Sequence, residues 1–195
     1  MQSRLPFLIL CTALVALGLQ VPASQAMLGG TLGQTLWRLV GYFTILTNLG
    51  VAAVMLAEVA GHRASARLAG GLTLAILMVA LVYHLLLAGL WRPTGLAWWA
   101  DQGLHTAVPA LVLVWWLVRA QKRVSLRDLP IWLVWPMIYL TYALVRGLAT
   151  GFWPYPFLDP ATLGWARVTA HIAGITLAFV GLALVLILLA RRSVR

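Results

Sequence analysis

The chain has 195 residues, of which 63% are hydrophobic and only 9% carry a charge. Soluble globular domains carry about 25% charged residues, so this chain lacks the side chains to cover a water-facing surface, and lipid must be its main solvent. The net charge of +10 would be compatible with a nucleic-acid partner. We exclude nucleic acid, because the basic residues lie in short segments between apolar runs. That pattern is typical of a topology signal and of contact with anionic lipid headgroups.

Six apolar runs follow one another along the chain. Each is close to the roughly 20 residues that a helix needs to cross the hydrocarbon core of a bilayer. The runs are 6–23, 37–59, 68–91, 98–118, 129–150 and 165–190. Together with short loops they use up the chain. The sequence therefore predicts an all-α protein, a polytopic membrane bundle of six transmembrane helices that forms one domain over residues 1–195.

The first run has a second interpretation. Arg4, the apolar stretch after it and the small residues Ser24, Gln25 and Ala26 also resemble a cleaved signal peptide. Cleavage would leave five helices and an amino terminus outside the cell. We favour a retained helix, because the run is long enough to span and because an even number of helices suits the charge distribution. The single cysteine, Cys11, offers no disulfide and no metal site.

Lysine and arginine divide unevenly between the two sides that six helices would define. Four of the 14 basic residues fall on one side, namely Arg38, Arg92, Arg146 and Arg167. The remainder fall on the other side, at the two ends of the chain and in the segments 60–67 and 119–128. Basic loops stay in the cytoplasm. We therefore predict a multi-pass protein of the bacterial inner (plasma) membrane with both termini in the cytoplasm.

Five of the predicted helices carry a polar side chain six or seven residues from a tryptophan at the outer end. At a rise of 1.5 Å per residue, all five would lie about 10 Å below the outer interface. These residues are Thr44, His84, His105, Arg146 and His171. Ionisable groups inside a membrane are costly unless they face a partner or a wet cavity. The shared depth predicts one pocket in the outer half of the bundle.

Two local spacings add chemistry to this pocket. Asp101 and His105 are four residues apart and share a helix face, where a carboxylate can fix the tautomer of an imidazole. Thr44, Thr47 and Asn48 cluster on one side of a helix and offer hydroxyl nucleophiles and hydrogen-bond donors. Simpler interpretations exist for each residue. A histidine can pack between helices, a threonine can bond its own backbone, and Arg146 can reach the outer headgroups.

Three segments resemble a known family. Residues 98–109 (WWADQGLHTAVP), 155–159 (YPFLD) and 42–49 (YFTILTNL) are similar to the His-Thr segment, the Tyr-Pro-Phe-Leu-acidic loop and the Phe-x-Thr segment of the androgen-induced-gene and androgen-dependent TFPI-regulating proteins. The chain also resembles a related bacterial group of six-helix membrane proteins, the "Pr-six-Pr" proteins. The resemblance covers almost the whole chain in order and spacing.

The resemblance implies a threonine hydrolase of lipid esters that needs no cofactor. Animal members of the family cleave fatty acid esters of hydroxy fatty acids with a threonine nucleophile and a histidine base. Carried over, His105 is the base and Thr44 the nucleophile, with Thr47 as a rival. Asp101 stands where animal members carry an amide side chain. The expected partners are membrane lipid and an acyl-chain substrate.

Two other classes of function remain open at this point. One is a non-catalytic protein that binds or transports a lipid or a small solute. The other is a haem or quinone protein, in which two of His84, His105 and His171 would ligate one haem. For an ester hydrolase, Asn48, His84, Arg146 and His171 are all candidate donors to an oxyanion, and the sequence does not rank them.

Overall fold

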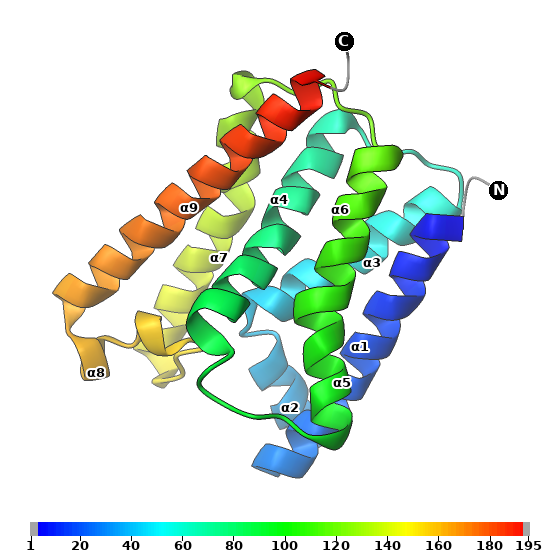
Figure 1. Ribbon diagram of the computed structural model, residues 1–195. Coiled ribbons are helices and arrows are strands. Elements are labelled where there is room, and N and C mark those ends of the chain that lie inside the picture. Colours follow the sequence, from blue (N-terminus) through cyan, green and yellow to red (C-terminus); the bar gives the residue numbers. More distant parts are fainter. Residues whose placement is uncertain (1–3, 193–195) are drawn as a thin grey trace. The chain divides into compact units, whose positions relative to one another are not determined.

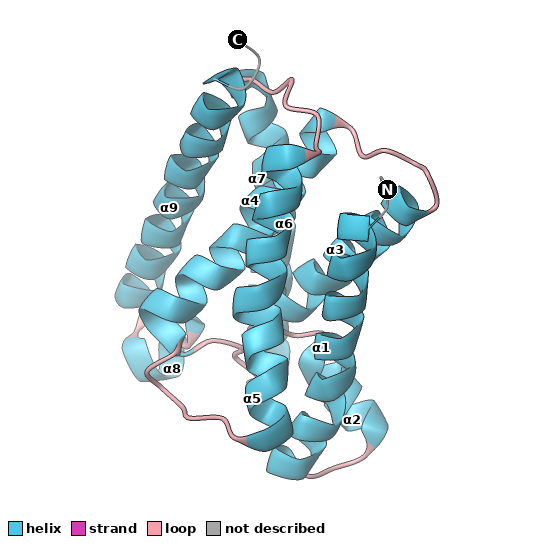
Figure 2. Cartoon of the chain, turned by 45° about the vertical axis from the view of Figure 1, so that its right-hand side comes forward, coloured by secondary structure: helices cyan, strands magenta, loops and turns pink. Residues whose placement is uncertain are grey.

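The computed structural model describes residues 4–192, which form helices and connecting loops (Figures 1 and 2). The prediction of an all-helical protein is confirmed. Within residues 4–192, four helices are long and apolar enough to cross a membrane, or five if a sharply bent pair counts as one span. The chain divides into two compact units, the first ending at Lys122 and the second beginning at Arg123. Each unit is described by itself.

The first unit packs its helices around α1. Its elements are α1 (Arg4–Leu28), α2 (Leu32–Leu39), α3 (Phe43–Val59), α4 (Ala66–Val82), the π-helical segment η1 (Tyr83–Leu87), α5 (Gly95–Gln102), the π-helical segment η2 (Gly103–Ala107) and α6 (Val108–Val118). The helix α1 packs against α3, α5 and α6, while α4 packs against α3 and α6 (Figure 1). The segments α5, η2 and α6 follow one another without a break, in the place of the predicted run 98–118.

The prediction of one straight helix over 37–59 is wrong. The structure has two helices there, α2 and α3, which meet at 88°. Reciprocal hydrogen bonds between Thr31 and Gln34 cap the start of α2. The backbone of Tyr42 is extended (φ −98°, ψ 131°), and α3 starts at the next residue. Thr44 therefore lies in the first turn of a new helix, and its depth does not follow from counting along one axis from Trp37.

Small side chains bring α1 close to the other helices of its unit. Ile9, Ala13 and Ala16 on α1 are at most 3% exposed. Ala16 belongs to a buried cluster with Leu39, Ile45 and Leu104. Inside a membrane, helices associate through close packing rather than through exclusion of water, and small residues permit that approach. The cluster lies beside the turn that carries Thr44 and the segment that carries His105.

Two π-helical turns, η1 and η2, interrupt the regular helices of the first unit. The amide of Ala88 donates to the carbonyl of Tyr83 at 2.8 Å, and the amide of Val108 donates to that of Gly103, so each bond spans five residues instead of four. Such turns are frequent at functional sites. One of them carries His84 and the other carries His105.

The second unit contains two long helices joined by a proline-rich and aromatic loop. Its elements are η3 (Leu126–Asp128), α7 (Leu129–Thr150), η4 (Pro156–Leu158), α8 (Pro160–Leu163) and α9 (Trp165–Arg192). Their positions match the predicted runs 129–150 and 165–190. Gly151 ends α7 in the left-handed region (φ 72°), a conformation that glycine adopts without strain. The helices α7 and α9 contact each other.

Candidate functional site

Thr44 and His105 lie side by side in the first unit. The hydroxyl oxygen of Thr44, on α3, is 3.4 Å from Nε2 of His105, on η2. The Thr44 residue is 8% exposed and the His105 side chain 15% exposed. Thr47 is buried one turn farther along α3. The structure thus places the hydroxyl of Thr44 at an imidazole nitrogen.

The contact of Nδ1 of His105 determines which ring nitrogen carries the hydrogen. Nδ1 lies 3.0 Å from the backbone carbonyl oxygen of Asp101. A carbonyl oxygen only accepts hydrogen bonds, so Nδ1 must carry the hydrogen. In the neutral ring, Nε2 then presents its lone pair to the Thr44 hydroxyl, which becomes the donor. This arrangement is the one that a general base needs beside a hydroxyl nucleophile.

The Asp101 carboxylate approaches the same imidazole. Its Oδ1 is 3.3 Å from Nδ1 of His105, as the spacing of four residues predicts. The other oxygen, Oδ2, accepts hydrogen bonds from the Tyr83 phenol and from Nε2 of Gln102, at 3.3 Å for the amide. Oδ1 is buried and accepts no hydrogen bond in this structure. One oxygen of the carboxylate is thus held by neighbours, and the other faces the histidine.

Tyr83 is a member of this site that the sequence pattern does not single out. It is 5% exposed and its ring stacks on the His105 imidazole, with centroids 4.0 Å apart and planes 14° apart. The same phenol donates to Asp101. Tyr83 stands within an apolar run, and its only signal in the sequence is its position next to His84.

His84 joins the site through a chain of hydrogen bonds. Its Nε2 is 3.1 Å from the Thr106 hydroxyl, which donates to Oε1 of Gln102 at 3.2 Å. Gln102 turns its amide nitrogen to the Asp101 carboxylate, so its oxygen must face Thr106. The hydrogen of the Thr106 hydroxyl goes to that oxygen, and His84 is the donor to Thr106. His84 is therefore not a base for this hydroxyl.

Asn48 connects the two segments that carry Thr44 and His105. Its Nδ2 donates to the carbonyl of Thr44 at 2.9 Å and to the carbonyl of Leu104 at 3.4 Å. The two hydrogens of the amide are then both engaged, so in this arrangement Asn48 is a link between backbones rather than a donor to an oxyanion.

The first turn of α3 supplies backbone donors beside the nucleophile. The first hydrogen bond of this helix runs from the amide of Leu46 to the carbonyl of Tyr42. The amides of Thr44 and Ile45 precede it and have no partner within the helix. The start of a helix also carries a partial positive charge. These amides are candidate donors to a negative oxygen that forms near the Thr44 hydroxyl.

Arg146 and His171 belong to the second unit. Arg146 is 6% exposed; its Nη1 donates to the Tyr142 hydroxyl at 2.7 Å, and its guanidinium carbon lies 4.7 Å from the centre of the Phe152 ring. His171 is exposed on α9, 6.4 Å from the Phe157 ring. Of the five residues predicted to converge, the structure brings together Thr44, His84 and His105. The convergence of the other two with them stays a prediction.

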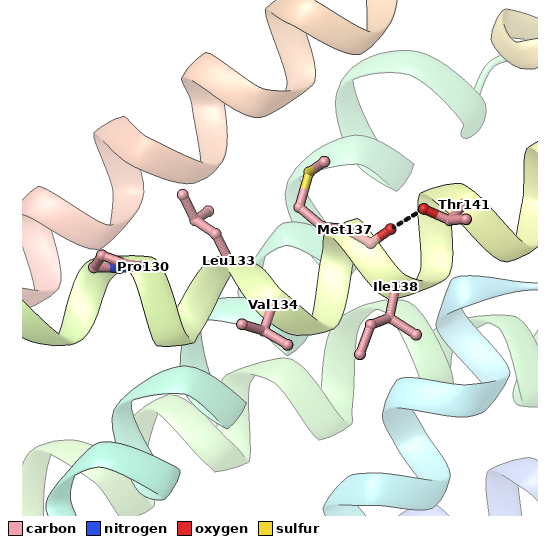
Figure 3. A pocket seen from close by; sticks show the side chains of 6 residues that line it. All are labelled: Pro130, Leu133, Val134, Met137, Ile138 and Thr141. Carbon is pink, nitrogen blue, oxygen red and sulfur yellow. Dashed lines mark hydrogen bonds between the residues drawn. The ribbon is translucent and has the colours of Figure 1, made fainter.

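An open hollow of about 440 Å³ lies along α7 in the second unit (Figure 3). Its lining residues are Pro130, Leu133, Val134, Met137, Ile138 and Thr141. The Thr141 hydroxyl donates to the carbonyl of Met137 at 3.0 Å, so its hydrogen is engaged within the helix. The lining has no ionisable side chain. The hollow suits an apolar chain and carries no reaction chemistry of its own.

No protein-family model, no curated protein and no solved structure matches this chain.

Proposed function

We propose that the protein is a membrane-embedded hydrolase of lipid esters, with Thr44 as the nucleophile and His105 as the general base. The observation that carries this proposal is the 3.4 Å contact between the Thr44 hydroxyl and Nε2 of an imidazole whose Nδ1 is bonded to the Asp101 carbonyl. The resemblance to the androgen-induced-gene and androgen-dependent TFPI-regulating proteins supports the same two roles and suggests fatty acid esters of hydroxy fatty acids as substrates.

The proposed reaction has two steps. Oγ1 of Thr44 attacks the ester carbonyl carbon while Nε2 of His105 takes the hydroxyl proton. The tetrahedral oxyanion is stabilised by the first-turn amides of α3. The intermediate then expels the alcohol, which takes the proton from Nε2. In the second step, His105 removes a proton from water, the water oxygen attacks the acyl-Thr44 ester, and the fatty acid leaves as Thr44 regains its proton.

The proposal also includes an orientation of the helices in the membrane. We place six spans in a bacterial inner membrane, with α2 and α3 together as the second and α5 to α6 as the fourth, and with both termini in the cytoplasm. The basic segments 60–67 and 119–128 support this orientation. An ester-bearing lipid would reach Thr44 from within the bilayer, so its acyl chains would stay in an apolar environment.

The direct test is fatty acid release by purified protein in nanodiscs loaded with lipid esters. Thr44→Val and His105→Gln should each reduce the rate by about 100-fold or more, the range that general-base catalysis commands. Thr73→Val is the matched control, because Thr73 is fully buried on α4 and its hydroxyl bonds only the Ala69 carbonyl of its own helix. Unchanged release in both site variants would overturn the assignment.

A second candidate function is non-catalytic binding of a lipid. The observation that favours it is the apolar hollow along α7. In that case the protein would retain an acyl-chain ligand without turnover, and a fluorophosphonate probe of hydroxyl nucleophiles would leave binding unchanged. Labelling of Thr44 by the probe, with loss of the label in Thr44→Val, would favour the hydrolase.

A further inference from the structure

We propose that Tyr83 is a positioning residue for His105. Tyr83 holds the Asp101 carboxylate by one oxygen and covers one face of the His105 imidazole. The effect on turnover rests on the proposed hydrolase function. The effect on the histidine ring does not, since it follows from contacts within the first unit.

The two oxygens of the Asp101 carboxylate have different neighbours. The Tyr83 phenol and the Gln102 amide both donate to Oδ2, and Oδ1 is left 3.3 Å from Nδ1 of His105. The carboxylate is 1% exposed, so water does not compete for it. Hydrogen bonds to a buried carboxylate are strong. Tyr83, together with Gln102, therefore leaves Oδ1 for the histidine.

His105 needs a stronger hydrogen-bond acceptor at Nδ1 when Nε2 takes a proton. The imidazolium carries a full charge, and its Nδ1 hydrogen is better matched by a carboxylate oxygen than by a neutral carbonyl. The Asp101 carbonyl lies 3.0 Å from Nδ1 and Oδ1 lies 3.3 Å from it, so a small rotation of the ring exchanges one acceptor for the other. The exchange requires Oδ1 to stay in place, which is the part that we assign to Tyr83.

The ring of Tyr83 covers one face of the His105 imidazole. It lies nearly parallel to the imidazole at 4.0 Å between centroids, and it also meets the His84 ring edge to face at 5.0 Å. Such a stack permits a small turn of the imidazole in its own plane, opposes a flip about the Cβ–Cγ bond, and keeps lipid and water from that face. Tyr83 reaches this position from η1, while His105 reaches it from η2.

Kinetics provide the first test. Tyr83→Phe keeps the ring and removes the hydroxyl, and we expect kcat to fall about 10-fold or more while KM changes by less than about 2-fold. In Asp101→Asn, kcat should fall further. If Tyr83 acts through Asp101, the double variant should be no slower than Asp101→Asn alone, because residues that act as one unit are not additive. Replacing Tyr83 with 4-aminophenylalanine, which restores a donor on the same ring, should recover most of kcat.

The second test does not depend on turnover. The chain has 4 histidines, so protein labelled with ¹⁵N-histidine gives few ring signals, and His105→Gln identifies those of His105. Tyr83→Phe should shift the His105 ring signals, while Thr73→Val should leave them unchanged. If Tyr83→Phe does not fold, the protein with 4-aminophenylalanine at position 83, which keeps the ring and changes the donor to Oδ2, is measured in the same way.

The outcomes separate the two proposals. Wild-type protein without ester hydrolysis would end the proposed function, and the ¹⁵N signals would still decide the position of Tyr83. Unshifted His105 signals in Tyr83→Phe, or losses in kcat that multiply in the double variant, would overturn the assignment of Tyr83 even in an active hydrolase. Shifted signals, together with non-additive kinetics where the protein hydrolyses esters, are the expected result.

Discussion

The amide nitrogen of Asn48 lies 3.4 Å from the carbonyl oxygen of Leu104, the residue directly before His105. The same nitrogen donates to the carbonyl of Thr44 at 2.9 Å. Asn48 is fully buried. One side chain thus fixes the backbone at the nucleophile relative to the backbone at the base, although 61 residues of sequence separate these two.

Replacing Asn48 with leucine should loosen this link. The two carbonyls would lose their shared donor inside an apolar bundle, at a cost of about 1–3 kcal/mol in the free energy of unfolding. Ester hydrolysis should fall as well, because the Thr44–His105 distance would no longer be fixed. Thermal unfolding in detergent and fatty acid release measure the two effects.

The neighbouring variant Leu49→Ala is the control for Asn48→Leu. Leu49 is 46% exposed on the same helix, and its replacement should change stability by less than about 0.5 kcal/mol. Equal unfolding temperatures in the two variants would mean that Asn48 does not fix the site.

Gly103→Ala should push η2 away from α1. A Cβ at Gly103 would lie 2.6 Å from Cβ of Ala16, which is far inside van der Waals contact. We expect a loss of about 1–3 kcal/mol in stability, as for other overpacked cores. The double variant Ala16→Gly/Gly103→Ala should recover most of the loss, since it removes the atom that clashes.

Gly18→Ala is the matched control for Gly103→Ala. Gly18 lies on α1, and a Cβ there would meet nothing within 4 Å, so this variant should be as stable as the wild type or more stable. A Gly103→Ala protein with wild-type stability would show that α1 and η2 do not pack as closely as described.

The sequence predicts the helices of this protein better than it predicts the site. Apolar runs have one simple physical meaning, so the helix Leu129–Thr150 coincides with its run. The bend between α2 and α3 does not appear in the run 37–59, because the residues around Gly41 are as apolar as their neighbours. The capping box of Thr31 and Gln34 is the local signal that a helix starts before Trp37.

Counting along straight helices predicts one depth for Thr44, His84 and His105, but the structure brings them together through a bend and two π-helical turns. The π-helical turns η1 and η2 rotate His84 and His105 relative to a regular helix, and the bend places Thr44 in a first turn. The spacing of Asp101 and His105 predicts their contact, because it is local. The contacts of Tyr83 are between elements, and no pattern within one helix predicts them.

The loop between α7 and α9 contains a carboxylate whose titration the structure explains. The Thr162 hydroxyl donates to Asp159 at 2.7 Å, and with the backbone amides of Ala161 and Thr162 it holds the pKa of Asp159 below its ordinary value of 3.8. A lowered pKa means that the folded loop favours the charged form. This contribution to stability is present above pH 3.8 and is lost as the pH falls through the pKa of the folded state.

Thr162→Val should therefore raise the pKa of Asp159 toward 3.8. Carboxyl ¹³C chemical shifts of labelled aspartate, followed against pH, measure the change. Thr169→Val is the control, because the Thr169 hydroxyl bonds the Trp165 carbonyl within α9. If Asp159 titrates at the same pH in Thr162→Val and in the wild type, the hydroxyl is not the main cause of the shift.

The proposed arrangement of six spans predicts which loops face the cytoplasm. Cys11 is the only cysteine, so Cys11→Ser gives a background in which single cysteines can be placed at will. His62, Gln121, Thr94 and Ala161 are all exposed, the first three in loops and Ala161 in the short helix α8. In the proposed arrangement, His62→Cys and Gln121→Cys lie on the basic side, and Thr94→Cys and Ala161→Cys lie on the other. A membrane-impermeant maleimide should label the second pair in cells with a permeabilised outer membrane, and the first pair only after the inner membrane is broken.

Six spans require this alternation, because one crossing separates each loop from the next and successive loops therefore lie on opposite sides of the membrane. Labelling of Gln121→Cys and Thr94→Cys from the same side would mean that Gly95–Val118 does not cross the membrane, and the span count would have to be reduced.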